Sequence, residues 1–434
     1  MTDKDSLTGQ EIEEIDAYAL YGAVVTAVSP TQLDIRDRAY VICEDGLCRG
    51  VFDELPDRYR DIEVIDYADQ LITPGFVDLH THGPQYNFRG LKMDLQLLDW
   101  LNQYTFPEEA KFRDLTYAER SYDLFASDLY EGVTTRACVF GTTDVASTII
   151  LMELLEETGL VTYVGKVNMD SNAPEGLIET TEESLEMTAE WLEAVSDFEN
   201  TYPILTPRFA PSCSAELMTA LGVLARKTHL PVQSHLSENP EEVAWACELF
   251  DAKNNGEIFD RFGLFGGDVP TVMAHCVHGS DEEIALMKER GVFVAHCPEA
   301  NMNLTSGIAP VRRYLEEGLN VGIGTDVAAG STASMLQAVK QAIEVSKISH
   351  RYIDDRYQAL TLEEAFWLGT MGGGRFFGKV GAFLDGYEFD AVVFDDASLM
   401  TMMDVTPKDR LERLIYCGDD RHVVGKFVRG RQLY

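Results

Sequence analysis

The sequence predicts an α/β protein: a (β/α)8 barrel of the TIM type, with a small β-sandwich domain formed from both chain ends. Between residues 73 and 377, apolar strand-like runs alternate with helical segments. Eight alternations over about 300 residues favour a closed barrel over an open doubly wound sheet, since no glycine-rich dinucleotide fingerprint follows the first run. The runs end near His82, Phe140, Asp170, Ala210, Glu238, Val277, Pro298 and Val327.

The segments before and after the predicted barrel have a different sequence pattern. Residues 1–16 are polar and acidic, and we expect a loose arm there. Short strand-like runs follow up to residue 72, and Asp45-Gly46 suits a tight hairpin between two of them. Strand-like runs return in 389–395 and 422–431. The expected organisation is therefore 1–72 and 378–434 as the two parts of the small β domain, with 73–377 as the barrel.

Helix caps support the helical segments of the barrel. Ser280 and Glu283 have the spacing of a capping box, and Gly291 follows as a stop signal. Thr361 and Glu364 repeat the capping-box spacing. The sequence therefore predicts helices that begin after residues 280 and 361.

Composition excludes several classes of function. The chain has 434 residues, 45% of them hydrophobic, and its net charge is −38, from 73 Asp and Glu against 35 Lys and Arg. Such acidity disfavours nucleic-acid binding and docking on an anionic membrane. The eight cysteines include no C-x-x-C pair, so we expect reduced, mostly buried thiols. The N-terminus lacks a signal-peptide pattern and the most apolar stretch, 17–28, is too short to span a bilayer, so the expected location is the cytoplasm.

The stretch from Thr73 to Tyr86 is the first candidate for chemistry. It is an apolar run that contains His80 and His82, two positions apart. Because side chains in a strand alternate faces, both imidazoles point the same way and can bind one metal ion. Taken alone, an H-x-H pair is as often a chance occurrence as a metal site.

Other predicted strands end with further metal-binding residue types. In a barrel, the carboxyl ends of the strands converge, so these residues can meet the histidine pair. Three to five nitrogen and oxygen donors around one ion suit zinc or iron. A lone strand-end histidine is more often structural, but the set together is a stronger signal. The full set is His80, His82, His235, His275 and Asp326.

Two further histidines lie close to this set in the sequence. His278 follows the apolar run that contains His275, so we place it outside the set of ligands. His296 ends the seventh run, and we expect it to contact the pocket or to form a hydrogen bond behind the ligands. His229, His350 and His422 have no such context.

Candidate catalytic and substrate-binding residues lie beside these ligands. Glu238 follows His235 by three residues and can move protons between water and a leaving nitrogen; the alternative is an acid at a helix N-terminus. Arg208 offers a rigid fork of donors to a carbonyl, the alternative being an ion pair with an acid. Phe209 can stack on a ring, and Gln85 presents a donor and an acceptor. Binuclear relatives of this architecture place a modified lysine on the fourth strand, whereas no lysine occurs in 202–214, so we expect one metal ion rather than two.

With these residues in place, the sequence resembles the amidohydrolase superfamily and, within it, the guanine deaminase family. The superfamily likeness rests on ProGlyPheValAspLeuHisThrHis, SerHisLeuSerGlu, AlaHisCys, HisCysPro and GlyThrAsp, in that order. The closer likeness rests on HisGlyProGlnTyr (82–86), GlnTyrThrPheProGluGlu (103–109), ThrProArgPheAlaProSerCysSer (206–214) and the stretch 324–336. It spans most of the chain.

The resemblance implies hydrolytic deamination of guanine to xanthine and ammonia, as part of purine catabolism. It implies one zinc ion per chain, with Fe2+ as the alternative, bound by His80, His82, His235 and Asp326, and His275 either on the metal or bonded to substrate or water. Glu238 would shuttle the proton, while Gln85, Arg208 and Phe209 would hold the purine. His82 and His235 would also border the substrate, and the family is expected to form homodimers. Glu299 departs from the family pattern and would change the charge of the pocket if it faced it.

Three rival functions are weaker. A related amidohydrolase could act on another amino-substituted ring, such as cytosine, an adenosine derivative or a triazine, but the HisGlyProGlnTyr and ProArgPhe strings favour guanine. A metal-free relative used in assembly would have lost ligands, whereas this chain has them all. A nucleic-acid deaminase is disfavoured by the net charge and by the missing P-C-x-x-C site.

Overall fold

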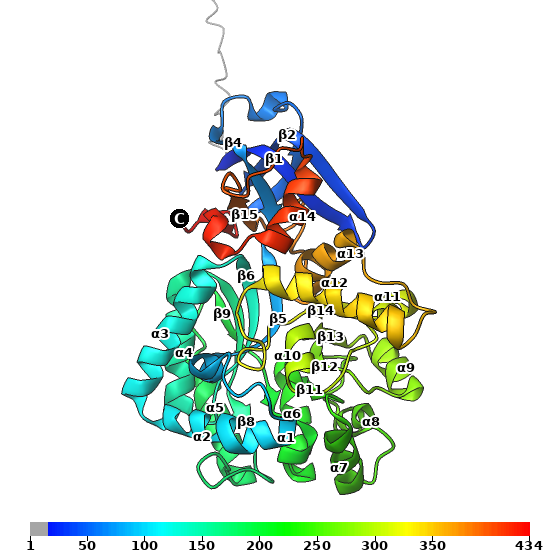
Figure 1. The fold of residues 1–434 in the computed structure, drawn as a ribbon. Helices are drawn as coiled ribbons and strands as arrows, with labels where there is room; N and C mark the ends of the chain where they lie inside the picture. The colour runs from blue at the N-terminus through cyan, green and yellow to red at the C-terminus, as the bar shows by residue number, and fades with distance from the viewer. Residues whose placement is uncertain (1–15) are drawn as a thin grey trace, which may run out of the picture.

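The computed structural model describes residues 16–434 and places a β-sheet above a barrel (Figure 1). The arm expected over residues 1–16 lies outside the described residues, apart from Asp16. Both ends of the described chain contribute to the upper sheet, and the middle of the chain forms the barrel below it. A barrel of parallel strands surrounded by helices confirms the predicted TIM-like α/β fold.

The upper sheet has seven strands in the order β17-β16-β15-β4-β1-β2-β3. Neighbouring strands are antiparallel except for β1 and β4, which are parallel. The strands are β1 (Ala17–Ser29), β2 (Gln32–Glu44), β3 (Leu47–Phe52), β4 (Glu63–Pro74), β15 (Ala391–Phe394), β16 (Val423–Val428) and β17 (Arg431–Gln432).

Two expectations for this sheet have different outcomes. Asp45 and Gly46 form the tight turn between β2 and β3, and both have the positive φ angles, 53° and 73°, that a type I′ turn requires. The two-layered sandwich is not confirmed, because within residues 16–434 the chain ends form one continuous hydrogen-bonded sheet. Helix α14 (Pro407–Cys417) packs against β1, β2 and β4 of that sheet.

The barrel contains eight parallel strands in the order β11-β12-β13-β14-β5-β6-β7-β9. A parallel bridge between Leu205 and Val232 closes the ring beside β11. The third and fourth strands are shorter than their apolar runs, and each is followed by a short strand of a separate pair, β8 and β10. The strands are β5 (Phe76–His82), β6 (Thr134–Phe140), β7 (Val161–Gly165), β8 (Val167–Asn168), β9 (Thr201–Pro203), β10 (Thr206–Pro207), β11 (Val232–Leu236), β12 (Thr271–His275), β13 (Phe293–His296) and β14 (Asn320–Ile323).

Helices surround the barrel strands (Figure 1). The α-helices are α1 (Leu97–Trp100), α2 (Phe106–Glu109), α3 (Leu115–Glu131), α4 (Val145–Thr158), α5 (Thr181–Ala194), α6 (Ala215–Thr228), α7 (Pro240–Phe250), α8 (Asn255–Phe262), α9 (Asp281–Arg290), α10 (Pro298–Asn303), α11 (Val311–Glu317), α12 (Met335–Tyr352) and α13 (Leu362–Trp367). The short 3-10 or π-helical turns are η1 (Asp57–Tyr59), η2 (Gly83–Phe88), η3 (Leu101–Thr105), η4 (Ala110–Arg113), η5 (Ala210–Ser212), η6 (Leu368–Gly372) and η7 (Asp420–His422).

The predicted helix starts are correct, but only one of the two capping boxes is complete. Thr361 and Glu364 form both reciprocal hydrogen bonds at the start of α13. At α9, Ser280 accepts from the Glu283 backbone N–H, and Gly291 ends the helix in a left-handed conformation. The Glu283 carboxylate does not return to Ser280; it accepts from the Ser237 hydroxyl and the Gly256 N–H. That carboxylate therefore ties α9 to neighbouring loops.

One continuous segment joins the sheet to the barrel. Strand β4 ends at Pro74 and β5 begins at Phe76, so only Gly75 separates them. A Cβ atom at Gly75 would lie 2.1 Å from the Thr135 hydroxyl oxygen, and this close approach requires glycine. Nearby, the buried Arg136 of β6 binds Asp390, with Nε 2.7 Å from Oδ2, and so connects the barrel to the residue before β15.

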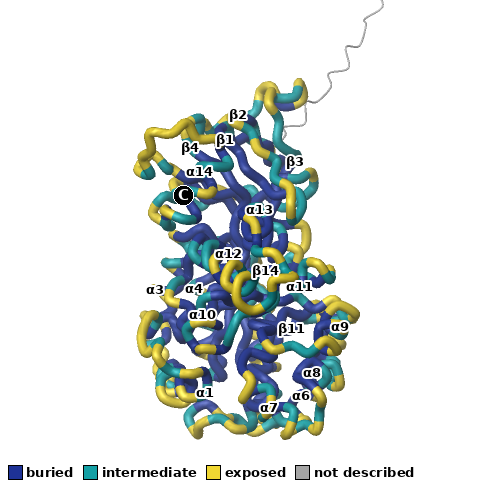
Figure 2. The backbone as a smooth tube through the Cα atoms, turned by 45° about the vertical axis from the view of Figure 1, so that its right-hand side comes forward, coloured by how far each residue is buried: buried dark blue, intermediate teal, exposed yellow. Residues whose placement is uncertain are grey.

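The burial pattern follows this architecture: buried segments run through the middle of the molecule, and exposed residues gather on its outer turns (Figure 2). Of the eight cysteines, all free, six are buried, Cys247 is half-buried and Cys417 is exposed, in agreement with the expectation of mostly buried thiols. Across residues 16–434, no helix combines the length and apolar character needed to cross a bilayer.

Candidate metal centre and adjoining pocket

The five predicted ligands gather at one end of the barrel. His80 and His82 lie on β5, His235 on β11 and His275 on β12, while Asp326 follows β14. Because the barrel strands are parallel, their carboxyl ends open on the same side, and these side chains meet there. His80, His82, His275 and Asp326 are buried and His235 is half-buried.

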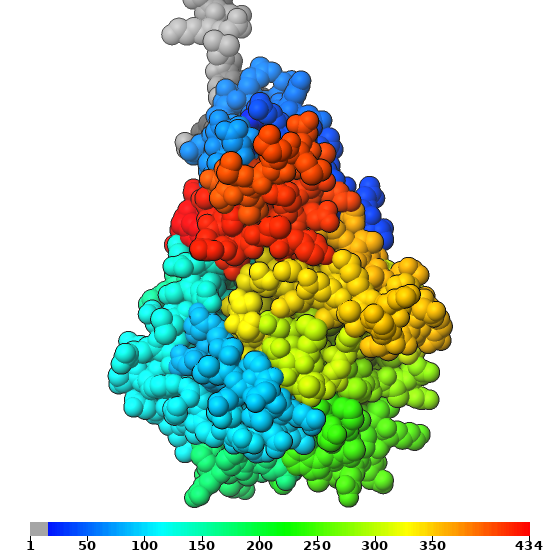
Figure 3. All heavy atoms as spheres, in the orientation of Figure 1, coloured from blue at the N-terminus to red at the C-terminus, as the bar shows by residue number. Residues whose placement is uncertain are grey.

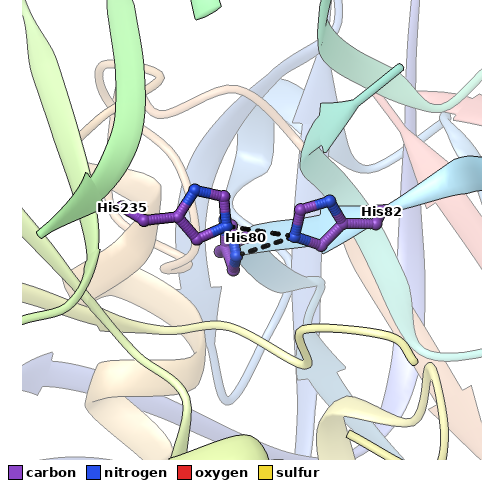
Figure 4. Close-up of side chains that lie close together, drawn as sticks. All are labelled: His80, His82 and His235. Atoms are coloured by element: carbon purple, nitrogen blue, oxygen red, sulfur yellow. Dashed lines mark hydrogen bonds between the residues drawn. The ribbon is translucent and has the colours of Figure 1, made fainter. Parts of the chain in front are cut away.

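The distances between donor atoms define a compact cluster. The Nε2 atom of His82 lies 3.2 Å from His80 Nε2 and 3.3 Å from His235 Nε2 (Figure 4). Oδ1 of Asp326 lies 3.2 Å from His80 Nε2 and 3.3 Å from His82 Nε2. His275 lies farther out, with Nε2 3.8 Å from Asp326 Oδ2. The ligand atoms of His80, His82 and His235 lie within 4.8 Å of one another, and so do those of His80, His275 and Asp326.

The electrostatics of the cluster suit metal binding. Burial lowers the pKa of His80, His82 and His235 well below the ordinary value, and neighbouring histidines lower it further. The three rings therefore favour the neutral form, in which an imidazole can bind a metal ion. At His275, burial also lowers the pKa, but the Glu238 and Asp326 carboxylates outweigh it, and the net pKa is raised.

Residues that the sequence reasoning did not assign hold these ligands in place. The Asp78 carboxylate accepts from the Thr325 N–H, the Thr325 hydroxyl and the His80 N–H, at 3.0, 2.5 and 3.1 Å. The Asp326 N–H in turn donates to the His80 carbonyl at 2.8 Å. Asp78 shares the strand parity of His80, which is the sequence signal that points to it.

The other two histidines are fixed from outside the cluster. His235 Nδ1 lies 2.6 Å from the Arg208 carbonyl oxygen, and His275 Nδ1 lies 2.9 Å from Asn301 Oδ1. Both partners are acceptors, so each Nδ1 carries a proton and leaves Nε2 facing the cluster. Nothing in the local sequence links Asn301 to His275.

Glu238 lies beside His275 and is buried. Its Oε2 atom is 3.4 Å from His275 Nε2, and the Ser306 hydroxyl donates to its Oε1 at 3.2 Å. Burial raises the pKa of Glu238, so the carboxyl group holds a proton more readily than an exposed one does. Glu238 directly precedes Asn239, the N-cap of α7, so it lies ahead of that helix as the alternative described, and it also lines the pocket.

A pocket opens beside the cluster and has an apolar wall. The wall comes from the segment that contains η2, α1 and η3, which covers the lower front of the barrel in light blue to cyan (Figure 3). The lining residues are His82, Gln85, Leu97, Trp100, Leu101, Arg208, Phe209, His235, Glu238, Glu242, His275, Leu304, Asp326 and Ala329. All of the predicted substrate-binding residues are in this set.

The polar residues of the pocket are connected by Glu109, which sequence reasoning missed. Arg208 donates to both carboxylate oxygens of Glu109, with Nη1 to Oε2 at 2.5 Å and Nη2 to Oε1 at 3.0 Å. Gln85 Nε2 donates to Glu109 Oε1 at 3.0 Å. Arg208 thus forms the ion pair that we considered as an alternative and also lines the pocket. The Phe209 ring lines the pocket as well and lies edge-on to Trp245, with centroids 6.1 Å apart.

The expectation for His296 is wrong, and the condition stated for Glu299 is not met. His296 is buried but does not line this pocket, because strand alternation turns its ring away from the barrel interior. Its Nδ1 atom has no hydrogen-bond partner among the described residues. Glu299 also lies outside the lining; its carboxylate accepts from the N–H and hydroxyl of Ser331, so it does not change the pocket's charge. As expected, His278 lies outside the cluster, with Nε2 2.6 Å from the Ser306 carbonyl oxygen.

Known proteins match both the sequence and the fold. A model of the amidohydrolase family matches residues 71–433. The guanine deaminase of Dictyostelium discoideum is 35% identical over 95% of this chain and 97% of its own length. The guanine deaminase of Mus musculus is 38% identical over 84% and 83%.

Among solved structures, a guanine deaminase from C. acetobutylicum with bound guanine superimposes with a TM-score of 0.94, at 44% identity, over 96% of this chain and 100% of that one. An adenosine deaminase from Xanthomonas campestris with bound zinc shares the fold, with a TM-score of 0.80 at 24% identity over 96% of this chain and 92% of its own.

Proposed function

The chain belongs to the amidohydrolase family, and we propose that within it the protein catalyses the hydrolytic deamination of guanine to xanthine and ammonia. The observation that carries this proposal is the meeting of the His/Asp donor cluster with Gln85, Arg208 and Phe209 in a single pocket. Relatives that match the chain over most of its length are guanine deaminases, which supports guanine as the ring that this pocket accepts.

We assign the cluster to one metal ion per chain, held by His80, His82, His235 and Asp326. Donors bound tetrahedrally to zinc at about 2.0–2.1 Å lie about 3.3–3.4 Å apart, and a set of three nitrogens and one oxygen suits zinc. The contacts of 3.2 and 3.3 Å in the structure fit this arrangement. Fe2+ is the alternative. When bound, such an ion acts as a Lewis acid and lowers the pKa of water.

Glu238, Asp326 and His275 would handle the protons of the reaction. Water adds its oxygen to C2 of the ring, one of its protons passes to a ring nitrogen, and the second leaves with the amino group as ammonia. Glu238 can carry these protons because it lies beside His275 in the pocket and burial raises its pKa, which favours the protonated form more than in an exposed carboxyl group. Asp326 accepts a hydrogen bond from the water. His275, whose nearest carboxylate is Glu238, faces the substrate side of the cluster.

Gln85, Arg208 and Phe209 would select the ring. Arg208 has guanidinium N–H groups beyond the two bound by Glu109, and these donate to the O6 carbonyl. Gln85 offers one more amide N–H and one more lone pair of its oxygen to the ring edge. Phe209 supplies an aromatic face, and the apolar wall limits the access of bulk solvent to the pocket.

Ammonia release tests this assignment directly. We expect zinc-loaded protein to release ammonia from guanine and to leave cytosine and adenine unchanged, and a chelated sample to lose the activity. Release from a different ring would keep the fold and the metal centre but would overturn the roles of Gln85 and Arg208. Metal analysis of the purified protein distinguishes zinc from iron.

Three predictions of the sequence have separate tests. The domain limits at residues 72 and 378 are tested by limited proteolysis, and the homodimer by light scattering in solution. The cytoplasmic location is tested by fractionation of the source cells.

A further inference from the structure

A single buried carboxylate, that of Glu109, joins the two polar side chains that face the substrate pocket. Glu109 ends α2 and is 2% exposed, and its partners Gln85 and Arg208 are equally inaccessible. The three residues come from three separate segments, namely η2, α2 and the loop after β10. Glu109 itself does not line the pocket, so it acts on a ligand only through its two partners.

The Glu109 carboxylate sets the orientation of the Gln85 amide. Gln85 Nε2 donates to Glu109 Oε1 at 3.0 Å, and Gln85 Oε1 accepts from the Ala328 N–H at 3.3 Å. A carboxylate only accepts and a backbone N–H only donates, so the reverse orientation of the amide would lose both hydrogen bonds. Gln85 therefore presents a defined donor and acceptor to the pocket.

Glu109 also balances the charge of Arg208. Arg208 is the one arginine or lysine among the described residues that line the pocket. Its guanidinium forms two parallel hydrogen bonds with Glu109, and the two side chains are 3% and 2% exposed. In such a buried place solvent does not screen an unpaired charge, so the pairing decides whether this side of the pocket is cationic or neutral.

We propose that Glu109 is a specificity-determining residue that keeps this side of the pocket electrically balanced, so that the pocket binds neutral, carbonyl-bearing purines and disfavours purine anions. The proposal builds on the proposed function, because the product xanthine is a stronger acid than guanine and ionises in mildly alkaline solution. An anion that lies against this side of the pocket loses hydration there without gaining an unpaired cation from Arg208 in return. The ionised product is therefore released, while the neutral substrate is bound.

The test compares two ligands that do not react further. Calorimetry gives the affinities for xanthine and for hypoxanthine, which also carries the six-position carbonyl but stays neutral in mildly alkaline buffer. The readout is the ratio of the two affinities, which cancels a general loss of binding. In Glu109→Gln the positive charge of Arg208 is unbalanced, and we expect the ratio to move toward xanthine by about tenfold or more, since close charge pairs of this kind change binding strongly. In mildly acidic buffer, where xanthine is neutral, the shift should disappear.

Three further variants complete the test. Glu109→Asp keeps the charge, so its ratio should equal that of the unmodified protein even if both affinities fall. Arg208→Gln leaves Glu109 unbalanced and should move the ratio away from xanthine, which tests the idea even if Glu109→Gln does not fold. Glu364→Gln is the matched control, because Glu364 is buried and binds both Nη atoms of Arg312 outside the pocket.

The outcomes separate the two proposals. An unchanged ratio in both Glu109→Gln and Arg208→Gln, or an equal shift in Glu364→Gln, would overturn the role of Glu109. Absence of guanine turnover in the unmodified protein would overturn the proposed function instead, and the binding ratio would still be measurable, since it requires no reaction.

Discussion

Replacing Glu238 by glutamine separates proton transfer from metal binding. The amide has the size of the carboxyl group and keeps one oxygen that can accept from the Ser306 hydroxyl, now 3.2 Å away. Glu238 contacts His275, which is not one of the four residues that we assign to the ion, so the substitution leaves those four donors in place. What the substitution removes is a buried group that can take up and release a proton.

The expected effect is large for turnover and small for folding. A positioned general acid or base contributes about 10²–10⁴-fold, which raises the barrier by about 3–5 kcal/mol, whereas one altered hydrogen bond changes stability by about 1 kcal/mol. The assay is the initial rate of ammonia release from guanine, with metal content and guanine affinity measured on the same sample. A Glu238→Gln variant that holds its metal and turns over within tenfold of the unmodified protein would refute the reasoning.

Three other substitutions test the scaffold. Arg136→Met leaves the buried Asp390 carboxylate without its arginine partner and should cost about 3–5 kcal/mol of stability, measured by urea unfolding. The double variant with Asp390→Leu should recover part of that loss, and no recovery would contradict the pairing. Burial raises the pKa of Asp420 to about 6. Between about pH 4 and pH 6 the folded protein therefore binds a proton that the unfolded chain has lost, and stability falls as pH rises through this window. In urea titrations, Asp420→Asn should remove this pH dependence of the free energy of unfolding and raise that free energy by up to about 3 kcal/mol at neutral pH. An unchanged pH dependence would refute the role of Asp420. Asp78→Asn offers one acceptor oxygen where three donors now converge on the carboxylate. The metal affinity, measured by titration with a competing chelator, should therefore fall about ten- to a hundredfold. An unchanged affinity would exclude Asp78 as a positioning residue.

The donor cluster could be predicted from sequence because its geometry depends on local rules. His80 and His82 share a face through strand alternation, and His235, His275 and Asp326 lie near the ends of apolar runs, which must converge if the strands form a barrel. The eight runs were sufficient to predict the barrel, although the third and fourth strands end earlier than their apolar runs.

Local rules could not predict the residues that act through long-range contacts. Glu109 meets Arg208 across a separation of 99 positions, and Asn301 meets His275 across 26. Their pairing depends on how helices and loops pack, and the local periodicity of the sequence does not predict that packing. The same reason explains Glu283, which has the spacing of a capping box but whose carboxylate accepts from the Ser237 hydroxyl instead of the Ser280 N–H.

The shared upper sheet also constrains how the protein is made. Strand β4 pairs on one side with β1 and on the other with β15, which begins at Ala391, close to the end of the chain. While the ribosome is still producing the barrel, β4 has an unpaired edge, and such an edge invites pairing with other chains. Biosynthesis therefore passes through an aggregation-prone stage that ends only when the last strands emerge. A chain truncated before residue 391 would remain at that stage, with an intact set of metal ligands but an open sheet.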